Sequence, residues 1–213
     1  MSWTQEETHG TADANIVRKY KTEDDGTLVF REAWVDVAEG SENGADDGEI
    51  YFVVNHGPVG QQSKSKEVVV ASEEEARGLL AGFAQQCAED GYAELGRDEQ
   101  FMVVAQIALK NARVTDRDKY LEEKAREALI AHLAWRGSGV VEKTEFVDGP
   151  HSTGKLNIYI LAPDAARAVA NIKVCVREHK LDFTKLSIGV APANDLAAIK
   201  GKYTPTGTTT FAL

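Results

Sequence analysis

The chain has 213 residues, 43% of them hydrophobic, and a formal net charge of −10. This length is enough for one large or two small domains, and no apolar run is long enough to span a membrane. Residues 1–15 are polar and acidic, so we expect neither a signal peptide nor a transit peptide.

The first part of the chain predicts a tail, strands and a loop. Residues 1–15 show no periodicity and are expected to form a disordered tail, while Ile16–Tyr20 is too short to assign. Thr27–Val37 has alternating apolar positions and predicts one or two strands. Ala38–Gly48 is rich in glycine and acids and predicts a loop. Its acids lack the alternating spacing of a calcium-binding loop.

Two further strands are predicted in the middle of the first half. Tyr51–Asn55 is aromatic and β-branched, and it ends at a cluster of glycine and proline. Glu67–Ala71 follows a polar connection of Gln, Ser and Lys. The two segments therefore predict an antiparallel hairpin.

A helix follows this hairpin. Ser72 is an expected N-cap residue, and Glu75 three residues later completes the pattern of a capping box. The apolar side chains that share one helical face are Leu79, Leu80 and Phe83. Gly91 is expected to end the helix.

The order of these elements resembles the WGR family. Its members carry a Trp-Gly-Arg turn followed by Val-Gly, a hairpin rich in Gln, Ser and Lys, and an amphipathic helix that ends in Lys-x-x-Gly-Tyr. Residues 55–67 (NHGPVGQQSKSKE) resemble the turn and hairpin, residues 88–92 (AEDGY) resemble that end, and the similarity covers residues 27–95. His56 stands in place of the Trp and Pro58 in place of the Arg. In poly(ADP-ribose) polymerases this Arg and the neighbouring basic surface help to contact nucleic acid, so the resemblance implies the fold and leaves nucleic-acid binding open.

The second half begins after a short polar joint at Gly96–Glu99, where the charge balance changes sign. Strands are predicted at Phe101–Leu109, Val140–Val147, Lys155–Ala162 and Leu186–Ala191, and helices after Thr115 and after Asp164. This order of elements is that of the ferredoxin-like arrangement, with two crossovers on one face of an antiparallel sheet. Beyond it, Asn194–Lys200 predicts a short helical piece, and the last six residues are β-prone.

We therefore predict an α+β protein with two domains. After the tail of residues 1–15, residues 16–97 are expected to form a WGR-like antiparallel sheet with one main helix. Residues 98–191 are expected to form a ferredoxin-like βαββαβ sandwich, and residues 192–213 a C-terminal extension. Because the ferredoxin-like fold serves many functions, it indicates none by itself.

Signals for catalysis or cofactor binding are weak. Gly149, Gly154 and Lys155 match the core of a phosphate-binding loop, but Lys155 enters a predicted strand instead of opening a helix. The five histidines and two cysteines lack the spacing of metal ligands or of a nucleophile motif. We expect no enzyme, no cofactor and no metal. Cys87 and Cys175 are expected to be free buried thiols, which favours the cytoplasm.

Charge separates the two halves of the chain. Residues 1–98 carry 21 acidic and 8 basic side chains, and residues 99–213 carry 13 and 16. An acidic half attracts basic surfaces and repels phosphate, although it can also serve only to keep an acidic bacterial protein in solution.

Two functional hypotheses follow. The first is a non-catalytic inhibitor, immunity or antitoxin-type protein, or adaptor, which binds a basic protein such as a toxin or a nucleic-acid-acting enzyme. The alternative is a nucleic-acid-associated WGR-type module, which the acidic charge disfavours. The predicted partner-binding residues are Asp46, Asp47, Glu49, His56, Lys64 and Lys66.

Overall fold

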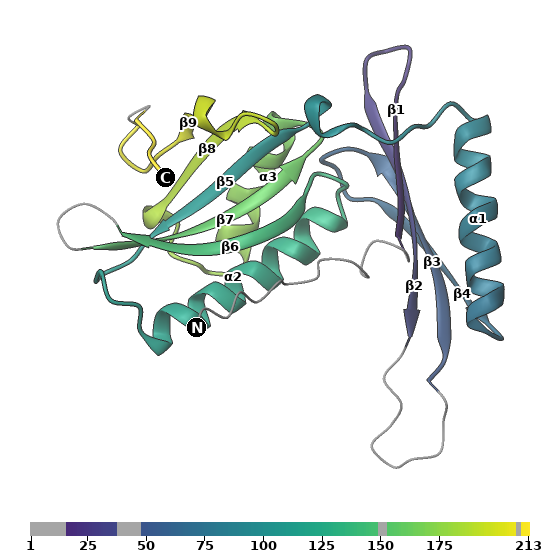
Figure 1. The fold of residues 1–213 in the computed structure, drawn as a ribbon, viewed down its shortest axis with the longest axis horizontal. Helices are drawn as coiled ribbons and strands as arrows, with labels where there is room; N and C mark the ends of the chain where they lie inside the picture. The colour runs from purple at the N-terminus through teal and green to yellow at the C-terminus, as the bar shows by residue number, and fades with distance from the viewer. Residues whose placement is uncertain (1–15, 38–47, 149–152, 208–209) are drawn as a thin grey trace, which may run out of the picture. The chain divides into compact units, whose positions relative to one another are not determined.

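The structure is a computed structural model that describes residues 16–37, 48–148, 153–207 and 210–213. The strands are β1 (Ile16–Thr22), β2 (Leu28–Val37), β3 (Ile50–Pro58), β4 (Lys64–Val70), β5 (Phe101–Ala108), β6 (Val140–Asp148), β7 (Gly154–Ala162), β8 (Leu186–Pro192) and β9 (Lys200–Tyr203). The helices are α1 (Glu73–Glu89), α2 (Asp116–Ala134) and α3 (Ala165–Glu178), with 3₁₀ turns at Arg97–Glu99, Phe183–Lys185 and Leu196–Ala198. The strands form two antiparallel sheets, which confirms the predicted α+β class (Figure 1).

The chain divides into two compact units. Unit 1 comprises the described parts of Met1–His56 together with Lys64–Glu94. Unit 2 comprises Gly57–Ser63 and the described parts of Leu95–Leu213. The short segment between His56 and Lys64, which joins two strands of unit 1 along the chain, therefore belongs to unit 2.

Unit 1 is a four-stranded sheet in the order β1-β2-β3-β4, with α1 against one face. The segment that the sequence left unassigned forms β1, in which Tyr20 lies opposite Phe30 of β2. The core between the sheet and α1 contains the buried residues Ala33, Phe52, Val70, Ala76 and Leu80. Leu80 and the partly buried Phe83 of the predicted apolar face make this contact, whereas Leu79 of the same predicted face is exposed.

Local hydrogen bonds fix both ends of α1. The Ser72 hydroxyl accepts a hydrogen bond from the Glu75 N–H at 3.2 Å, as predicted for an N-cap residue. The Glu75 carboxylate accepts from the N–H of Ala71 at 2.8 Å, one residue earlier than in a reciprocal capping box. Gly91 ends the helix with a φ of +82°, a conformation that favours glycine.

Unit 2 contains a five-stranded sheet in the order β6-β7-β5-β8-β9, covered on one face by α2 and α3 (Figure 1). The first four strands in chain order, β5 to β8, have the pairing of a ferredoxin-like sheet, with β5 between β7 and β8. Long apolar side chains of the sheet and of both helices are fully buried, among them Val103, Leu129, Ile158, Ile172 and Ile188.

The extension after β8 differs from its prediction. The helical piece predicted over Asn194–Lys200 is only a single 3₁₀ turn at Leu196–Ala198, and Lys200 already begins the edge strand β9, which pairs with β8. The β-prone residues 210–213 are not in a strand. The sequence of β9 (KGKY) has no apolar alternation, so its pairing is determined by the free edge of β8 and not by its own pattern.

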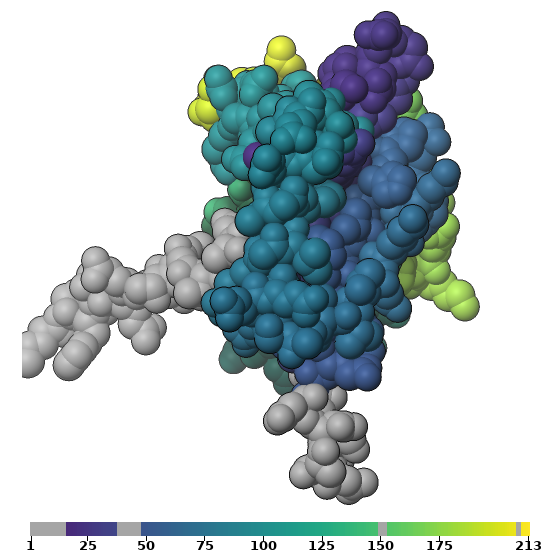
Figure 2. All heavy atoms as spheres, turned by 90° about the vertical axis from the view of Figure 1, so that its right-hand side faces the viewer, coloured from purple at the N-terminus to yellow at the C-terminus, as the bar shows by residue number. Residues whose placement is uncertain are grey.

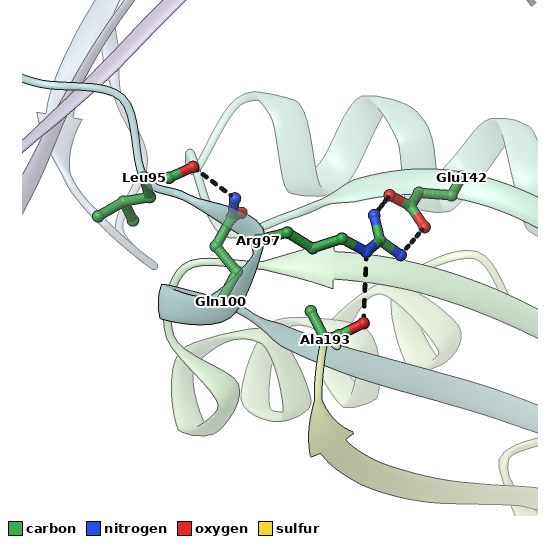
Figure 3. A network of polar contacts seen from close by, with 5 residues as sticks. All are labelled: Leu95, Arg97, Gln100, Glu142 and Ala193. Carbon is green, nitrogen blue, oxygen red and sulfur yellow. Dashed lines mark hydrogen bonds and ion pairs between the residues drawn. The ribbon is translucent and has the colours of Figure 1, made fainter. Parts of the chain in front are cut away.

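A polar network holds the start of unit 2 (Figure 3). The Arg97 guanidinium donates to both carboxylate oxygens of Glu142, at 2.6 and 2.9 Å, and its Nε donates to the Ala193 carbonyl at 3.3 Å. Glu142 lies where the pairing of β6 with β7 shifts register, and such a bulge redirects a side chain. The Gln100 amide donates to the Leu95 carbonyl at 3.1 Å and fixes the incoming chain.

Candidate functional site

The most distinctive surface of unit 1 is the outer edge of β4. This strand pairs with β3, and β4 is the last strand of the sheet within the described residues. Six of its seven residues are exposed, and Val70 alone is buried. The exposed residues include Val68 and Val69, which are 57% and 56% accessible. Unpaired backbone groups beside exposed valines make an edge that can accept another strand.

A third exposed apolar side chain lies on the same side of the sheet as Val68. Val68 is opposite Phe52 in the register, and Phe52 belongs to the core under α1. The Phe83 ring of α1 meets the Phe52 ring edge-on, with centroids 6.5 Å apart. Leu79 lies one helical turn before Phe83 and is 39% accessible. We use the term β4 edge for Val68, Val69 and Leu79 together with the backbone of β4.

Acidic side chains accompany the β4 edge. The Tyr51 hydroxyl donates a hydrogen bond to Glu49, and this bond, followed by the charges of Glu49 and Glu67, raises the pKa of Tyr51. Glu67, Val69 and Tyr51 lie on the same face of the β3–β4 pair. Val69 is directly opposite Tyr51, and Glu67 is opposite Val53, two residues further along β3. In the part of the chain that the structure describes, neither Glu49 nor Glu67 forms an ion pair.

The helix that follows β4 adds three more acids, Glu73, Glu74 and Glu75. Glu75 takes part in the cap, and Glu73 forms an ion pair with Arg77 at 2.7 Å. The positive end of the helix dipole stabilises all three carboxylates, so helix stability explains part of their presence here. Among the three, Glu74 is the one whose carboxylate makes neither an ion pair nor a hydrogen bond within the described residues, and it adds to the negative charge at the end of β4.

The opposite edge of this sheet is partly closed. Tyr20 of β1 exchanges two backbone hydrogen bonds with Ala93, from Tyr20 N–H to the Ala93 carbonyl at 2.8 Å and in return at 2.9 Å. No such bridge to β4 occurs within residues 16–37, 48–148, 153–207 and 210–213. The two edges therefore differ, and the β4 edge is the open one.

The predicted partner-binding residues do not form a single cluster. Glu49 precedes β3, at the end of the hairpin where Ile50 is opposite Val70. The other three described residues lie towards the opposite end, where His56 is opposite Lys64 and Lys66 is opposite Val54. The remaining two predicted residues, Asp46 and Asp47, lie outside the described residues.

Sequence reasoning missed the apolar part of this surface. A run of three valines is typical of a strand that is buried on both faces, so the pattern does not indicate that Val68 and Val69 are exposed. The signal that could have identified an edge strand is the pair Lys64 and Lys66, because lysines at alternate positions of a strand are common at sheet edges.

The histidine, cysteine and lysine side chains that could act in catalysis lie outside the β4 edge. Burial lowers the pKa of His132, whose Nδ1 lies 3.5 Å from a Glu178 oxygen. Burial also raises the pKa of the Cys87 thiol and raises that of Cys175 to about 12, so both thiols stay protonated. Lys155 lies in β7, as predicted, and donates to the Ala212 carbonyl at 2.7 Å. Gly149 lies outside the described residues.

Neither a metal cluster nor a membrane-spanning helix is present in the described ranges. They contain no group of three or more His, Cys, Asp or Glu side chains placed to hold a metal ion. Likewise, none of their helices is both long and apolar enough to cross a membrane.

Comparisons of the chain with protein-family models, with curated proteins and with solved structures find no match. The resemblance of residues 27–95 to the WGR family therefore stays a prediction from sequence. The functional argument below rests on the geometry and charge of the chain itself.

Proposed function

We propose that the protein is a non-catalytic protein-binding protein, in which the β4 edge pairs with an extended basic segment of a partner. The classes of protein that we propose are an inhibitor, an immunity or antitoxin-type protein, or an adaptor. The partner is a basic protein such as a toxin or a nucleic-acid-acting enzyme. The observation that supports the proposal is a strand edge that is open within the described residues, with exposed Val68 and Val69 beside Glu49 and Glu67, which form no described ion pair.

The backbone and side chains of the β4 edge have separate roles in this proposal. Main-chain hydrogen bonds to an added strand provide affinity that depends little on sequence. Val68, Val69 and Leu79 each have roughly half of their surface left to bury, which is worth about 1 kcal/mol per side chain. The carboxylates of Glu49 and Glu67 select a partner strand that carries Lys or Arg at the facing positions.

The test uses two variants on the two edges of the same sheet. Val69→Lys places a cation on the β4 edge, and Ile16→Lys places one on β1, where Ile16 is 43% accessible. Proteins captured from a lysate of the source organism by the intact chain are compared with those captured by each variant. We expect a basic protein that is lost at least tenfold with Val69→Lys, retained with Ile16→Lys, and released as salt rises. A partner that both variants retain equally would contradict the proposal.

A second candidate function is nucleic-acid binding, favoured by one observation. His56 and Lys64 lie opposite each other, and Lys66 follows on the same side, so three basic side chains are exposed together. We expect a Lys64→Glu, Lys66→Glu variant to lose any gel shift of a broken-ended duplex or of a single strand at low salt. Val69→Lys should leave such binding intact, so the two candidate functions are separable.

We place the protein in the cytoplasm as part of the same proposal. Cys87 and Cys175 are free and buried, and reduced thiols are usual in that compartment. Measurement of the free thiol content of protein isolated from the cell checks this placement.

A further inference from the structure

The face of the unit 2 sheet opposite α2 and α3 carries polar side chains at its centre. In the register, Gln106 of β5 is opposite Asn157 of β7, and Val104 is opposite both Tyr159 of β7 and Gly189 of β8. Gln106 is 7% accessible and Asn157 is 0% accessible. Two amides in the middle of a sheet are costly to bury unless their hydrogen bonds are satisfied.

Residues 210–213 lie on this face. The Phe211 ring packs beside Leu196 and Ile199 on a cluster of Met102, Val104 and Tyr159. The Ala212 carbonyl accepts two hydrogen bonds, from Gln106 Nε2 at 3.0 Å and from Lys155 Nζ at 2.7 Å. The segment is therefore held by one aromatic contact and by one carbonyl that accepts two hydrogen bonds.

Gly189 forms a notch for the aromatic ring. A Cβ added at this position would lie 2.5 Å from Phe211 Cε1 and 2.6 Å from Phe211 Cδ1. Gly189 has no left-handed φ, so the strand itself does not require glycine there. The absence of a side chain is thus needed for the close approach of the ring and not for the backbone.

The polar floor next to the notch consists of the Gln106 and Asn157 amides. The Gln106 amide also donates to Asn157 Oδ1 at 2.9 Å. The Asn157 Nδ2 atom is buried and makes no hydrogen bond of normal geometry within the described residues. A buried donor beside a bound peptide carbonyl is the arrangement of a site built to receive backbone, because a purely apolar floor would be less costly.

We propose that this face of unit 2 is a recognition site for an extended peptide with phenylalanine followed by a small residue, and that residues 210–213 occupy it in cis. The partner is a segment of another protein with the same chemistry, which replaces residues 210–213. The ring enters the Gly189 notch, and the next carbonyl is bound by Gln106 and Lys155. The site lies wholly in unit 2 and is independent of the β4 edge.

The test supplies the segment in trans. A chain that ends at Gly207 is titrated with the acetylated and amidated peptide Thr-Thr-Phe-Ala-Leu, the sequence of residues 209–213, and binding is followed by calorimetry and by amide chemical shifts. We expect saturable binding to the shortened chain and at least tenfold weaker binding to the full chain, where the cis segment has a millimolar effective concentration. A peptide with alanine in place of phenylalanine should lose binding at least tenfold.

Two variants keep the outcome decisive. Gly189→Ala in the shortened chain should abolish binding, since the added methyl group fills the notch. Phe211→Ala in the full chain should admit the peptide even if the shortened chain does not fold. Failure of the peptide to bind either open chain, or equal binding to Gly189→Ala, would show that residues 210–213 only cover the sheet, and would overturn the proposal. A shortened chain that dimerises and excludes the peptide would also overturn it.

Discussion

Replacing Gly60 by alanine should destabilise unit 2 through contacts that belong to the turn at residues 57–63. Gly60 has a φ of +89°, its N–H donates to the Arg136 carbonyl at 2.8 Å, and its carbonyl accepts from Asn171 Nδ2 at 3.3 Å. A Cβ added to Gly60 would lie 2.8 Å from Cδ and 2.9 Å from Cβ of Arg167. The replacement thus meets both backbone strain and a steric clash.

The magnitude follows from these two terms. An alanine in the left-handed region costs about 1–2 kcal/mol relative to glycine. Forcing a methyl group against a helix residue is comparable to overpacking, which costs about 1–3 kcal/mol. We expect Gly60→Ala to cost roughly 2–5 kcal/mol in total. Gly26 has a similar φ of +83° with nothing within 4 Å of an added Cβ, so Gly26→Ala should show the backbone term alone.

Native-state hydrogen exchange measured by mass spectrometry separates the two sites, because Gly26 belongs to unit 1 and Gly60 to unit 2. Peptides from α2 and α3 should lose protection against exchange in Gly60→Ala. In Gly26→Ala, peptides from β1 and β2 should lose protection by a smaller factor than those of α2 and α3 do in Gly60→Ala. Adding Arg167→Ala to Gly60→Ala should restore part of the loss, since Cγ and Cδ are removed. Equal losses at the two glycines, or no rescue, would refute the steric argument.

Three further outcomes are expected. Burial holds the pKa of His132 below its ordinary 6.5, so on acidification the unfolded chain binds a proton that the folded chain does not. The unfolding free energy, measured by urea titration, should therefore stay constant above pH 6.5 and decrease as the pH falls below 6.5. The decrease should be smaller in His132→Gln. Cys87 and Cys175 should react with a thiol reagent at pH 8 only as fast as the protein opens, and at once in denaturant. Removing the half-exposed pair of Arg97 and Glu142 in a double-mutant cycle should give a coupling of no more than about 1 kcal/mol.

Local signals were sufficient to predict most of the elements. Thr115 is the N-cap that the sequence predicts, and its hydroxyl accepts a hydrogen bond from the Asp118 N–H. Asp164, which the sequence places at the start of the next helix, accepts one from the Arg167 N–H. The apolar stripes between caps and glycines then define the helices, since both periodicity and capping are properties of a few neighbouring residues. These signals also determine the order of elements, from which the ferredoxin-like pairing follows by the handedness of crossovers.

Strand position within a sheet could not be predicted in the same way. Whether Val68 and Val69 are buried depends on whether another strand lies beyond β4, which is a property of the whole sheet. The same reason explains β9, whose residues pair because β8 has a free edge. The placement of residues 57–63 in unit 2 depends on contacts with Arg136 and Asn171, more than 70 residues away in sequence.

The ion pairs of unit 1 limit the number of basic side chains that are available for nucleic-acid binding, the second candidate function. Five of its basic side chains are paired with acids, namely Arg18, Lys19, Lys21, Arg31 and Arg77. Within the described residues of unit 1, this leaves Lys64 and Lys66 as the cations outside an ion pair. Two phosphate contacts give a slope of about −2 for log affinity against log salt on duplex DNA. A steeper slope would require phosphate contacts from further basic residues, such as those of unit 2, and would show that the hairpin is not the whole site of nucleic-acid binding.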